Sequence, residues 1–238
     1  MVISTLKRIP VLYEFLRYRI YAPLRSKNRK RIFLRIYQEN AWGDPSSVSG
    51  PGSSLEATAA LRRTLPGLLA ELGVKSLLDI PCGDLEWIKR VPLGIGKYIG
   101  ADIVEPLIEK NRIRYPDIGE FLHLDLLTDP LPVVDAILCR DCFIHLGNRD
   151  VLKALTNIAR TDAQYLITTT FPDLTANRDT VMPYWRALNL QLPPYNLPPP
   201  LRIVGDFSSL QAAHEQKYQG VWRISDLRGR FLKLGRPE

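Results

Sequence analysis

The chain has 238 residues, of which 45% are hydrophobic and 24% charged; this is the composition of a folded globular protein and excludes a largely disordered chain. Its length suits one substantial domain with appended segments. Three cysteines are too few for a disulfide framework or for the two C-x-x-C pairs of a common zinc site. We therefore expect no metal centre and a reducing, cytoplasmic location.

The positive charge is concentrated near the N-terminus. The net charge is +7, yet residues 1–40 alone contain ten Lys or Arg and two Glu, which leaves −1 for the rest of the chain. Glu14 and Arg17 interrupt the apolar residues of this region, so we expect no signal peptide, and no run reaches the roughly 18 apolar residues of a membrane span. We interpret residues 1–54 as a basic helical arm with a loop, and residues 55–238 as the main domain.

Two interpretations of the basic arm stay open. In the first, one or two amphipathic helices pack on the domain and expose a basic face. In the second, the arm contacts an anionic membrane surface or an acidic polymer, because clustered Lys and Arg beside aromatic residues suit an interface. We expect a helix over residues 26–39 and a loop over residues 41–54, where Gly, Pro and Ser accumulate.

A second helix is expected directly after this loop. Ser53 and Glu56 have the spacing of a capping box, in which a hydroxyl and a carboxylate satisfy exposed amides at a helix start, so the helix should begin near residue 55. Pro66 should kink or restart it, because proline has no amide hydrogen, and Gly73 should end it.

Beyond residue 73, short apolar runs alternate with segments that can form helices. The expected strands cover residues 76–80, 98–103, 120–124, 134–139 and 165–170, followed by an antiparallel pair at 201–207 and 217–224. The clearest helices cover residues 105–114 and 148–160, the latter with Asn148 as its N-cap. This alternation predicts an α/β fold: a Rossmann-like, doubly wound and mostly parallel sheet of about seven strands with an antiparallel C-terminal strand.

Acidic residues stand at the expected ends of the first four strands: Asp79, Asp102, Asp125 and Asp141. The carboxyl ends of parallel strands meet at one edge of a sheet, so these side chains should line up there. Buried charges without partners are costly, so we expect the acids to meet solvent, backbone amides or a ligand. For Asp79 and Asp125, capping of the backbone that follows is the structural alternative.

The turn after the first strand distinguishes between nucleotide ligands. A dinucleotide site needs G-x-G-x-x-G, and Gly83 is the only glycine here, which excludes an NAD-dependent oxidoreductase. The carboxylate of Asp79 would repel phosphates and attract a cation. Asp102 is placed to accept ribose hydroxyl protons, and Asp125 suits the amino group of an adenine. S-adenosylmethionine is such a cationic nucleoside without phosphates, and we expect it as the cofactor.

Residues 76–172 resemble a class I S-adenosylmethionine-dependent methyltransferase in four motifs. "LLDIPCGD" is similar to the first motif of that family, "YIGADI" to its acidic second strand, "HLDLLTD" to the third and "DAILCRDCFIHL" to the fourth. The D-x-P-C-G-D-x-x-W form of the first motif resembles a branch of small bacterial methyltransferases. In this form Pro81 and Leu85 replace two glycines, so we expect a rigid turn. Because Pro81 has no amide hydrogen, the turn would bind the ligand through its backbone carbonyls. We expect Trp87 in the core beneath this turn.

The resemblance implies a role for each motif. The methionine end of the cofactor would be held by Asp79, Pro81, Cys82, Gly83 and Asp84, the ribose by Asp102 and Ile103, and the adenine by Asp125 and Leu126. Arg140 and Asp141 would lie beneath the sulfonium, and we include Asp141 in the catalytic set.

Acceptor-side residues are expected after the fourth and fifth strands. His145 follows the fourth motif, where an imidazole could take the acceptor proton; an orienting or packing histidine is the alternative. The proline-rich segment near "LPPYN" would form a wall of the acceptor pocket, with Trp185, Asn189 and Tyr195 as candidate substrate-binding residues.

The favoured hypothesis is therefore methyl transfer from S-adenosylmethionine to a small-molecule or glycan acceptor, with oxygen favoured over nitrogen. A nucleic-acid methyltransferase is the nearest alternative, but positive charge confined to the arm offers no broad surface for phosphates. The third hypothesis is a non-catalytic cofactor-binding protein that its basic arm tethers to a membrane or a protein partner.

Overall fold

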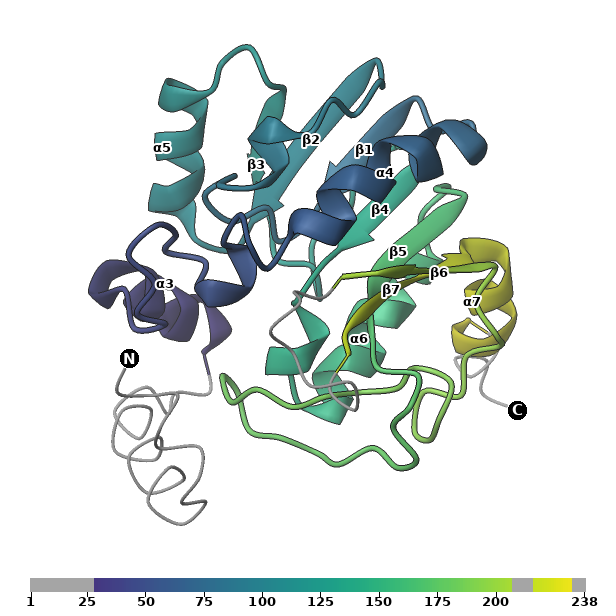
Figure 1. Cartoon of the computed structure of the whole chain (residues 1–238). Coiled ribbons are helices and arrows are strands. Elements are labelled where there is room, and N and C mark those ends of the chain that lie inside the picture. Colours follow the sequence, from purple (N-terminus) through teal and green to yellow (C-terminus); the bar gives the residue numbers. More distant parts are fainter. Residues whose placement is uncertain (1–27, 207–215, 233–238) are drawn as a thin grey trace.

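The computed structural model describes residues 28–206 and 216–232, which form one seven-stranded sheet in the order β3-β2-β1-β4-β5-β7-β6 (Figure 1). The strands are β1 (Ser76–Asp79), β2 (Lys97–Asp102), β3 (Glu120–His123), β4 (Ala136–Cys139), β5 (Tyr165–Thr170), β6 (Arg202–Gly205) and β7 (Tyr218–Arg223). Strands β1 to β5 pair in parallel, and β7 runs antiparallel to both β5 and β6. The predicted fold class is confirmed, including the antiparallel pair near the C-terminus.

The apolar strands are buried on both faces because helices cover the sheet from either side (Figure 1). One cluster packs Leu78, Ile99 and Ile137 against helices α6 (Asn148–Ala159) and α7 (Ile224–Phe231). The other packs Leu77 and Leu138 against α4 (Ala59–Glu71) and α5 (Glu105–Arg114). Successive strand residues thus point to opposite clusters, which explains why the strands appear in the sequence as continuous apolar runs.

Helix α4 begins later than predicted. Residues 55–58 form turns, and the first helical residue is Ala59. Ser54 Oγ accepts a hydrogen bond from the Ala57 amide at 3.2 Å, but the carbonyl of Leu55 accepts from the Arg62 side chain at 2.8 Å. The hydroxyl therefore caps a turn and not the helix, so the predicted start near residue 55 is wrong.

Helix α4 continues through Pro66, so the predicted restart at this residue is wrong. Leu61, Leu65 and Leu69 are fully buried along one side of the helix, and this packing outweighs the hydrogen bond that proline removes. Gly73 ends the helix as expected, with a φ of 68° in the left-handed region that favours glycine.

The N-terminus of α6 is capped differently from the prediction. Gly147 is the N-cap residue, and Asn148 is the first residue of the helix. The Asn148 amide donates to the Asp179 carboxylate at 2.7 Å, while its side-chain oxygen accepts from the Tyr195 hydroxyl at 2.6 Å and from Arg186 at 3.0 Å. A residue 31 positions away therefore supplies the cap that the local sequence assigned to Asn148.

Helix α3 (Arg29–Glu39) occupies the described part of the predicted basic helix. Its buried residues Ile32 and Ile36 pack beside Trp42 and Met182, so this helix rests on the body of the protein. Within residues 28–206 and 216–232, no helix has the length and apolarity to cross a membrane. The rest of the predicted arm, residues 1–27, lies outside the described residues.

Candidate functional site

The carboxyl edge of the sheet gathers the four predicted acids. Asp79 and Asp102 are the last residues of β1 and β2, and Asp125 and Asp141 follow β3 and β4 by two residues. Chain connections leave β1 and β4 in opposite directions across the sheet, and ligands of such folds bind at this kind of switch point. The predicted placement of the acids is confirmed, and their roles toward a ligand stay predictions.

Asp79 is buried at the centre of this edge. It is 2% exposed, and its Oδ2 accepts a hydrogen bond from the Tyr98 hydroxyl at 2.8 Å. Burial raises the pKa of Asp79 to about 7, although Tyr98 and Arg140 act in the opposite direction. Near neutral pH this carboxyl group therefore changes its charge readily, and a bound cation would favour its ionised form.

The turn after β1 is held from several sides. Gly83 has a φ of 57°, its amide donates to Asp102 at 3.2 Å, and its carbonyl accepts from the buried Asn111 side chain at 2.8 Å. Leu85 is 1% exposed and adopts a φ of 60°, a region unfavourable for side chains, so core packing holds this backbone in place. Pro81 is partly exposed and Cys82 is buried in the core.

Asp84 binds the loop that precedes α4. Its carboxylate accepts from Ser47 Oγ at 2.9 Å, the Val48 amide at 2.9 Å and Ser49 Oγ at 3.2 Å. A Cβ atom at Gly83 would lie 2.2 Å from Ser49 Oγ, so any other residue here would displace the Ser49 side chain and would also strain the positive φ of this position. The two serines were not predicted as site residues, since a Ser-rich loop alone does not indicate which residue it contacts.

Asp102 lies between the turn and the end of β2. It is 5% exposed, and its two oxygens accept from the Gly83 amide at 3.2 Å and the Val104 amide at 3.0 Å. Burial raises the pKa of Asp102 to about 6 against the effect of these amides. The carbonyl of the adjacent Ile103 accepts a hydrogen bond from His123 at 3.2 Å.

Asp125 has partners from two parts of the chain. One oxygen accepts from the Leu127 amide at 3.0 Å, as the capping alternative predicted, and the other pairs with Arg29 of α3 at 2.9 Å. Neighbouring Leu126 is buried, and its carbonyl accepts from Asn157 at 2.9 Å. Nothing in the local sequence indicated that Arg29, 96 residues away, would meet Asp125.

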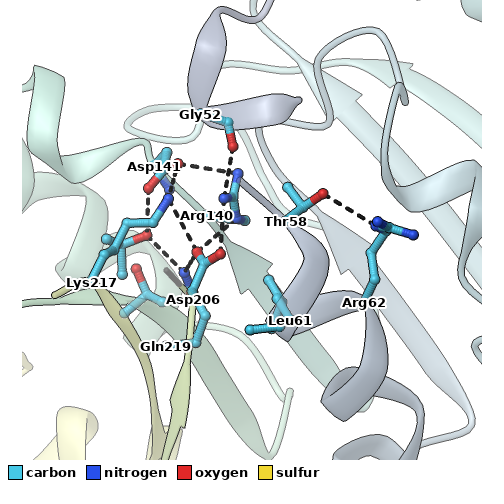
Figure 2. A network of polar contacts seen from close by, with 12 residues as sticks. Gly52, Thr58, Leu61, Arg62, Arg140, Asp141, Asp206, Lys217 and Gln219 are labelled. Carbon is cyan, nitrogen blue, oxygen red and sulfur yellow. Dashed lines mark hydrogen bonds and ion pairs between the residues drawn. The ribbon is translucent and has the colours of Figure 1, made fainter. Parts of the chain in front are cut away.

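A buried ion-pair network connects the end of β4 with β6 and β7 (Figure 2). Arg140 donates to Asp206 at 2.8 and 3.0 Å and to the carbonyl of Gly52 at 2.9 Å, and it lies 3.1 Å from Asp141. Lys217 pairs with Asp141 at 2.7 Å and with Asp206 at 3.2 Å. Two cations therefore meet two carboxylates, so the charges of these four side chains balance.

This network fixes the charge of the two predicted residues within it. Burial alone would lower the pKa of Arg140, but Asp141 and Asp206 outweigh burial and raise it. For Asp141, burial is outweighed by Arg140 and Lys217, which lower its pKa below the ordinary value. Such a carboxylate is a weak proton acceptor, so its chemistry is that of a fixed negative charge. Thr169 also bonds to it, with the hydroxyl 3.1 Å from Oδ1.

Trp87 is 5% exposed beneath this network, which confirms its predicted place in the core. The guanidinium of Arg140 lies 5.3 Å from the centre of its ring, at the distance of a cation–π contact.

His145 ends a short 3-10 helix, Phe143–His145, after β4. Its Nδ1 lies 3.0 Å from the carbonyl of Pro183, and a carbonyl only accepts hydrogen bonds, so Nδ1 carries a proton. The neutral ring then has its acceptor nitrogen at Nε2. Trp42 stacks on the imidazole with 5.1 Å between ring centres and an interplanar angle of 29°. The orientation of the ring is therefore fixed on two sides.

The three predicted acceptor-side residues differ in exposure. Trp185 is 46% exposed and contacts Phe171 edge-on. Tyr195 is fully buried, with its hydroxyl bonded to Asn148 and Arg186. Asn189 is 4% exposed, and its amide nitrogen donates to backbone carbonyls of the loop after β5. Of the three, Trp185 presents surface to a molecule from outside, and the other two shape the loops around it.

In the described ranges 28–206 and 216–232, no group of three or more His, Cys, Asp or Glu side chains is arranged to hold a metal ion. All three cysteines are unpaired.

The raised pKa of Asp79 predicts a specific pH dependence of stability. The ordinary pKa is 3.8 and the folded value about 7, so the stabilisation from the folded-state proton is present below pH 3.8 and is lost as pH rises through 7. Asp79→Asn should remove this loss, because asparagine does not ionise. The melting temperature of the variant minus that of the unsubstituted protein should therefore be larger at pH 8 than at pH 5. Thermal unfolding without cofactor measures this difference.

Asp135 provides a control of opposite sign. Its carboxylate accepts from the Lys75 and Ser76 amides, both at 2.8 Å, and these bonds lower its pKa. Asp135→Asn should therefore cost more stability at pH 8 than at pH 3. An Asp79→Asn variant whose relative stability falls from pH 5 to pH 8 would contradict the assigned direction.

No protein-family model matches the sequence, and no curated protein is significantly similar to it. Solved structures match the fold. Magnesium protoporphyrin IX methyltransferase from Synechocystis PCC 6803, with bound S-adenosylmethionine, matches with a TM-score of 0.54 and 14% identity, over 83% of this chain and 98% of that one. The N-methyltransferase NodS from Bradyrhizobium japonicum WM9, in complex with S-adenosylhomocysteine, matches with a TM-score of 0.55 and 16% sequence identity. This match covers 79% of this chain and 97% of NodS.

A third similar structure is 1,6-didemethyltoxoflavin-N1-methyltransferase from Burkholderia thailandensis, with a TM-score of 0.58 and 17% identity over 85% of this chain and 88% of that one. At these identities the likeness establishes the fold. The chain has the fold of class I methyltransferases, with nearly the whole length of each similar structure covered.

Proposed function

We propose that the chain transfers the methyl group of S-adenosylmethionine to a small or sugar-like polar acceptor. The observation that carries this proposal is the pair Asp79 and Asp102, two buried carboxyl groups at adjacent strand ends beside a turn without a phosphate cradle. A ligand that offers an ammonium group and ribose hydroxyls would satisfy both, whereas phosphates would be repelled. The fold is shared with proteins whose structures contain S-adenosylmethionine or S-adenosylhomocysteine.

In this proposal each site residue has one task. Asp79 and the turn from Pro81 to Asp84 hold the methionine end, with Cys82 and Gly83 within that turn. Asp102 and Ile103 bind the ribose, and Asp125 and Leu126 bind the adenine. Arg140 and Asp141 lie beneath the sulfonium, where the balanced network prevents either residue from shifting.

The acceptor approaches from the side of His145 and Trp185. A sulfonium is a strong methyl donor, so alignment of the acceptor atom in line with the departing sulfur supplies much of the rate. His145 receives the acceptor proton at Nε2, the nitrogen opposite the one bonded to Pro183. The exposed indole of Trp185 offers an apolar face to a sugar ring or a similar acceptor.

Oxygen is the favoured acceptor atom, because a hydroxyl loses its proton during transfer and His145 provides a nearby base. Nitrogen is the alternative, and two of the structures with the same fold are N-methyltransferases. We place the reaction in a reducing, cytoplasmic location, in keeping with three unpaired cysteines. Contact of the basic arm with a membrane surface is a further part of the proposal, argued from its sequence alone.

Calorimetry with the full chain tests the cofactor. We expect micromolar binding of S-adenosylmethionine and S-adenosylhomocysteine and no binding of NAD, because the turn lacks the glycines that approach a pyrophosphate. The absence of micromolar binding to both sulfur compounds would overturn the proposed function.

The acceptor can then be identified with labelled cofactor in a cell extract. We expect the methyl label in a small-molecule or glycan fraction. Label in RNA or DNA would instead favour a nucleic-acid methyltransferase, and cofactor binding without any labelled product would favour a non-catalytic protein.

A further inference from the structure

One continuous N-terminal segment, residues 28–54, contacts the predicted site at several points. Arg29 pairs with Asp125, Ser47 and Ser49 bond to Asp84, and the carbonyl of Gly52 accepts from Arg140. These contacts span the carboxyl edge from β3 to β4. The segment is therefore part of the site's wall, and its side chains are candidates for ligand recognition.

Arg29 has the geometry of a recognition residue. Its Nη2 lies 2.9 Å from Asp125 Oδ2, and the two side chains are 20% and 6% exposed. The Nε atom of Arg29 is buried and has no hydrogen-bond partner among residues 28–206 and 216–232. A buried donor without a partner is unfavourable, so a ligand acceptor at this position would be stabilised.

The position of Arg29 is set by packing. It is the first residue of α3, whose N-cap is Asn28 and whose buried Ile32 and Ile36 fix the helix on the body. Asp125 uses one acceptor site for Arg29 and one for the Leu127 amide, and a carboxylate offers about four such sites. The ion pair therefore leaves Asp125 able to accept one further hydrogen bond from a ligand.

We propose that Arg29 is a specificity-determining residue that, together with Asp125, recognises the adenine base of the cofactor. Asp125 accepts from the 6-amino group, and Arg29 orients that carboxylate and donates to a ring nitrogen of the base. On the edge of adenine that carries the 6-amino group, this donor lies beside a ring nitrogen that accepts a hydrogen bond. Hypoxanthine has the opposite pattern, because it carries a carbonyl in place of the amino group and an N–H in place of the acceptor nitrogen. The inference rests on the proposed cofactor and adds which residues read its base.

The test compares binding of S-adenosylhomocysteine with that of its deaminated analogue, S-inosylhomocysteine, by calorimetry. The unsubstituted chain should prefer the adenine compound by at least about tenfold. Arg29→Met should weaken S-adenosylhomocysteine about tenfold and reduce that preference, because donor and orientation are both lost. Arg29→Lys, which keeps the charge without the planar fork, should give intermediate affinity.

Two controls separate recognition from a structural effect. Arg31→Met makes the same substitution at an exposed position of α3 and should leave both affinities unchanged. In an Asp125→Asn background, Arg29→Met should weaken binding by a smaller factor than in the unsubstituted chain, because the orienting contact is already lost and only the direct bond to the base remains to be removed. A purely structural role of Arg29 would instead weaken both ligands by the same factor, which would overturn the proposal.

Two further outcomes are decisive. Tighter binding of S-adenosylhomocysteine by Arg29→Met would show that Arg29 competes with the base, and this also overturns the inference. If the unsubstituted chain binds S-adenosylhomocysteine with micromolar affinity and Arg29→Met binds it equally, only the inference fails. If the unsubstituted chain does not bind it, the proposed function itself has failed.

Discussion

Replacing Asp206 by leucine should lower the free energy of unfolding by about 3–5 kcal/mol, the usual cost of removing one partner from a buried ion pair. Asp206 is fully buried and accepts from Arg140, Lys217 and Gln219, with donor–acceptor distances of 2.7 to 3.2 Å (Figure 2). Its removal leaves two largely buried cations against the single carboxylate of Asp141. Chemical denaturation of the full chain measures the loss.

A matched control is Asp162→Leu, which removes an ion pair from the surface. Asp162 is 86% exposed and lies 3.4 Å from Arg228, so its loss should leave stability nearly unchanged. Adding Arg140→Met to Asp206→Leu should recover part of the lost stability, since the uncompensated cation is then gone. Equal stability of the Asp206 and Asp162 variants would contradict the network's assigned role.

The sheet was predictable because its signals are local. The central strands β1, β2 and β4 are short apolar runs, and α5 has the predicted bounds Glu105–Arg114. The errors occurred where a distant partner outweighed local preference. The α4 start moved because Arg62 bonds the Leu55 carbonyl, and the α6 cap came from Asp179.

Local sequence signals predicted only part of the candidate site. Regular alternation places one acid at the end of each of the first four strands, so the positions of Asp79 and Asp102 followed from the pattern. Their partners did not. Arg29 meets Asp125 from 96 residues away and Asp206 meets Arg140 from 66 residues away, and no local motif encodes such pairs.

These long-range partners divide the carboxyl edge into two regions with different electrostatics. At Arg140 and Asp141 the charges are balanced and held in place by segments from both ends of the chain. At Asp79 and Asp102, by contrast, burial raises the pKa of two carboxyl groups that accept hydrogen bonds from the Tyr98 hydroxyl and from backbone amides, which are all neutral donors. The second region is therefore less favourable without a ligand, which is the property expected of a binding site.

Replacing Asp102 by alanine should weaken binding of S-adenosylhomocysteine by about 100-fold or more. Two ribose hydroxyls donating to one carboxylate each contribute roughly 1.5–3 kcal/mol, and about 1.4 kcal/mol corresponds to a factor of ten. Asp102→Asn keeps the size of the side chain and one acceptor oxygen. Its affinity for S-adenosylhomocysteine should therefore lie between that of the unsubstituted chain and that of Asp102→Ala. Calorimetry at pH 8, where the Asp102 carboxyl with a pKa of about 6 is ionised, gives the comparison.

The carboxylate also accepts from the Gly83 and Val104 amides, so its loss disturbs the turn as well as the ligand. Thermal unfolding of each variant without ligand shows how far the turn is affected, and Asp117→Ala removes an exposed acid beyond α5 as a control. If Asp102→Asn binds as tightly as the unsubstituted chain while Asp102→Ala is merely less stable, the carboxylate supports the turn and does not bind the ribose. A graded loss from Asp to Asn to Ala at similar stability is the result that assigns Asp102 to the ligand.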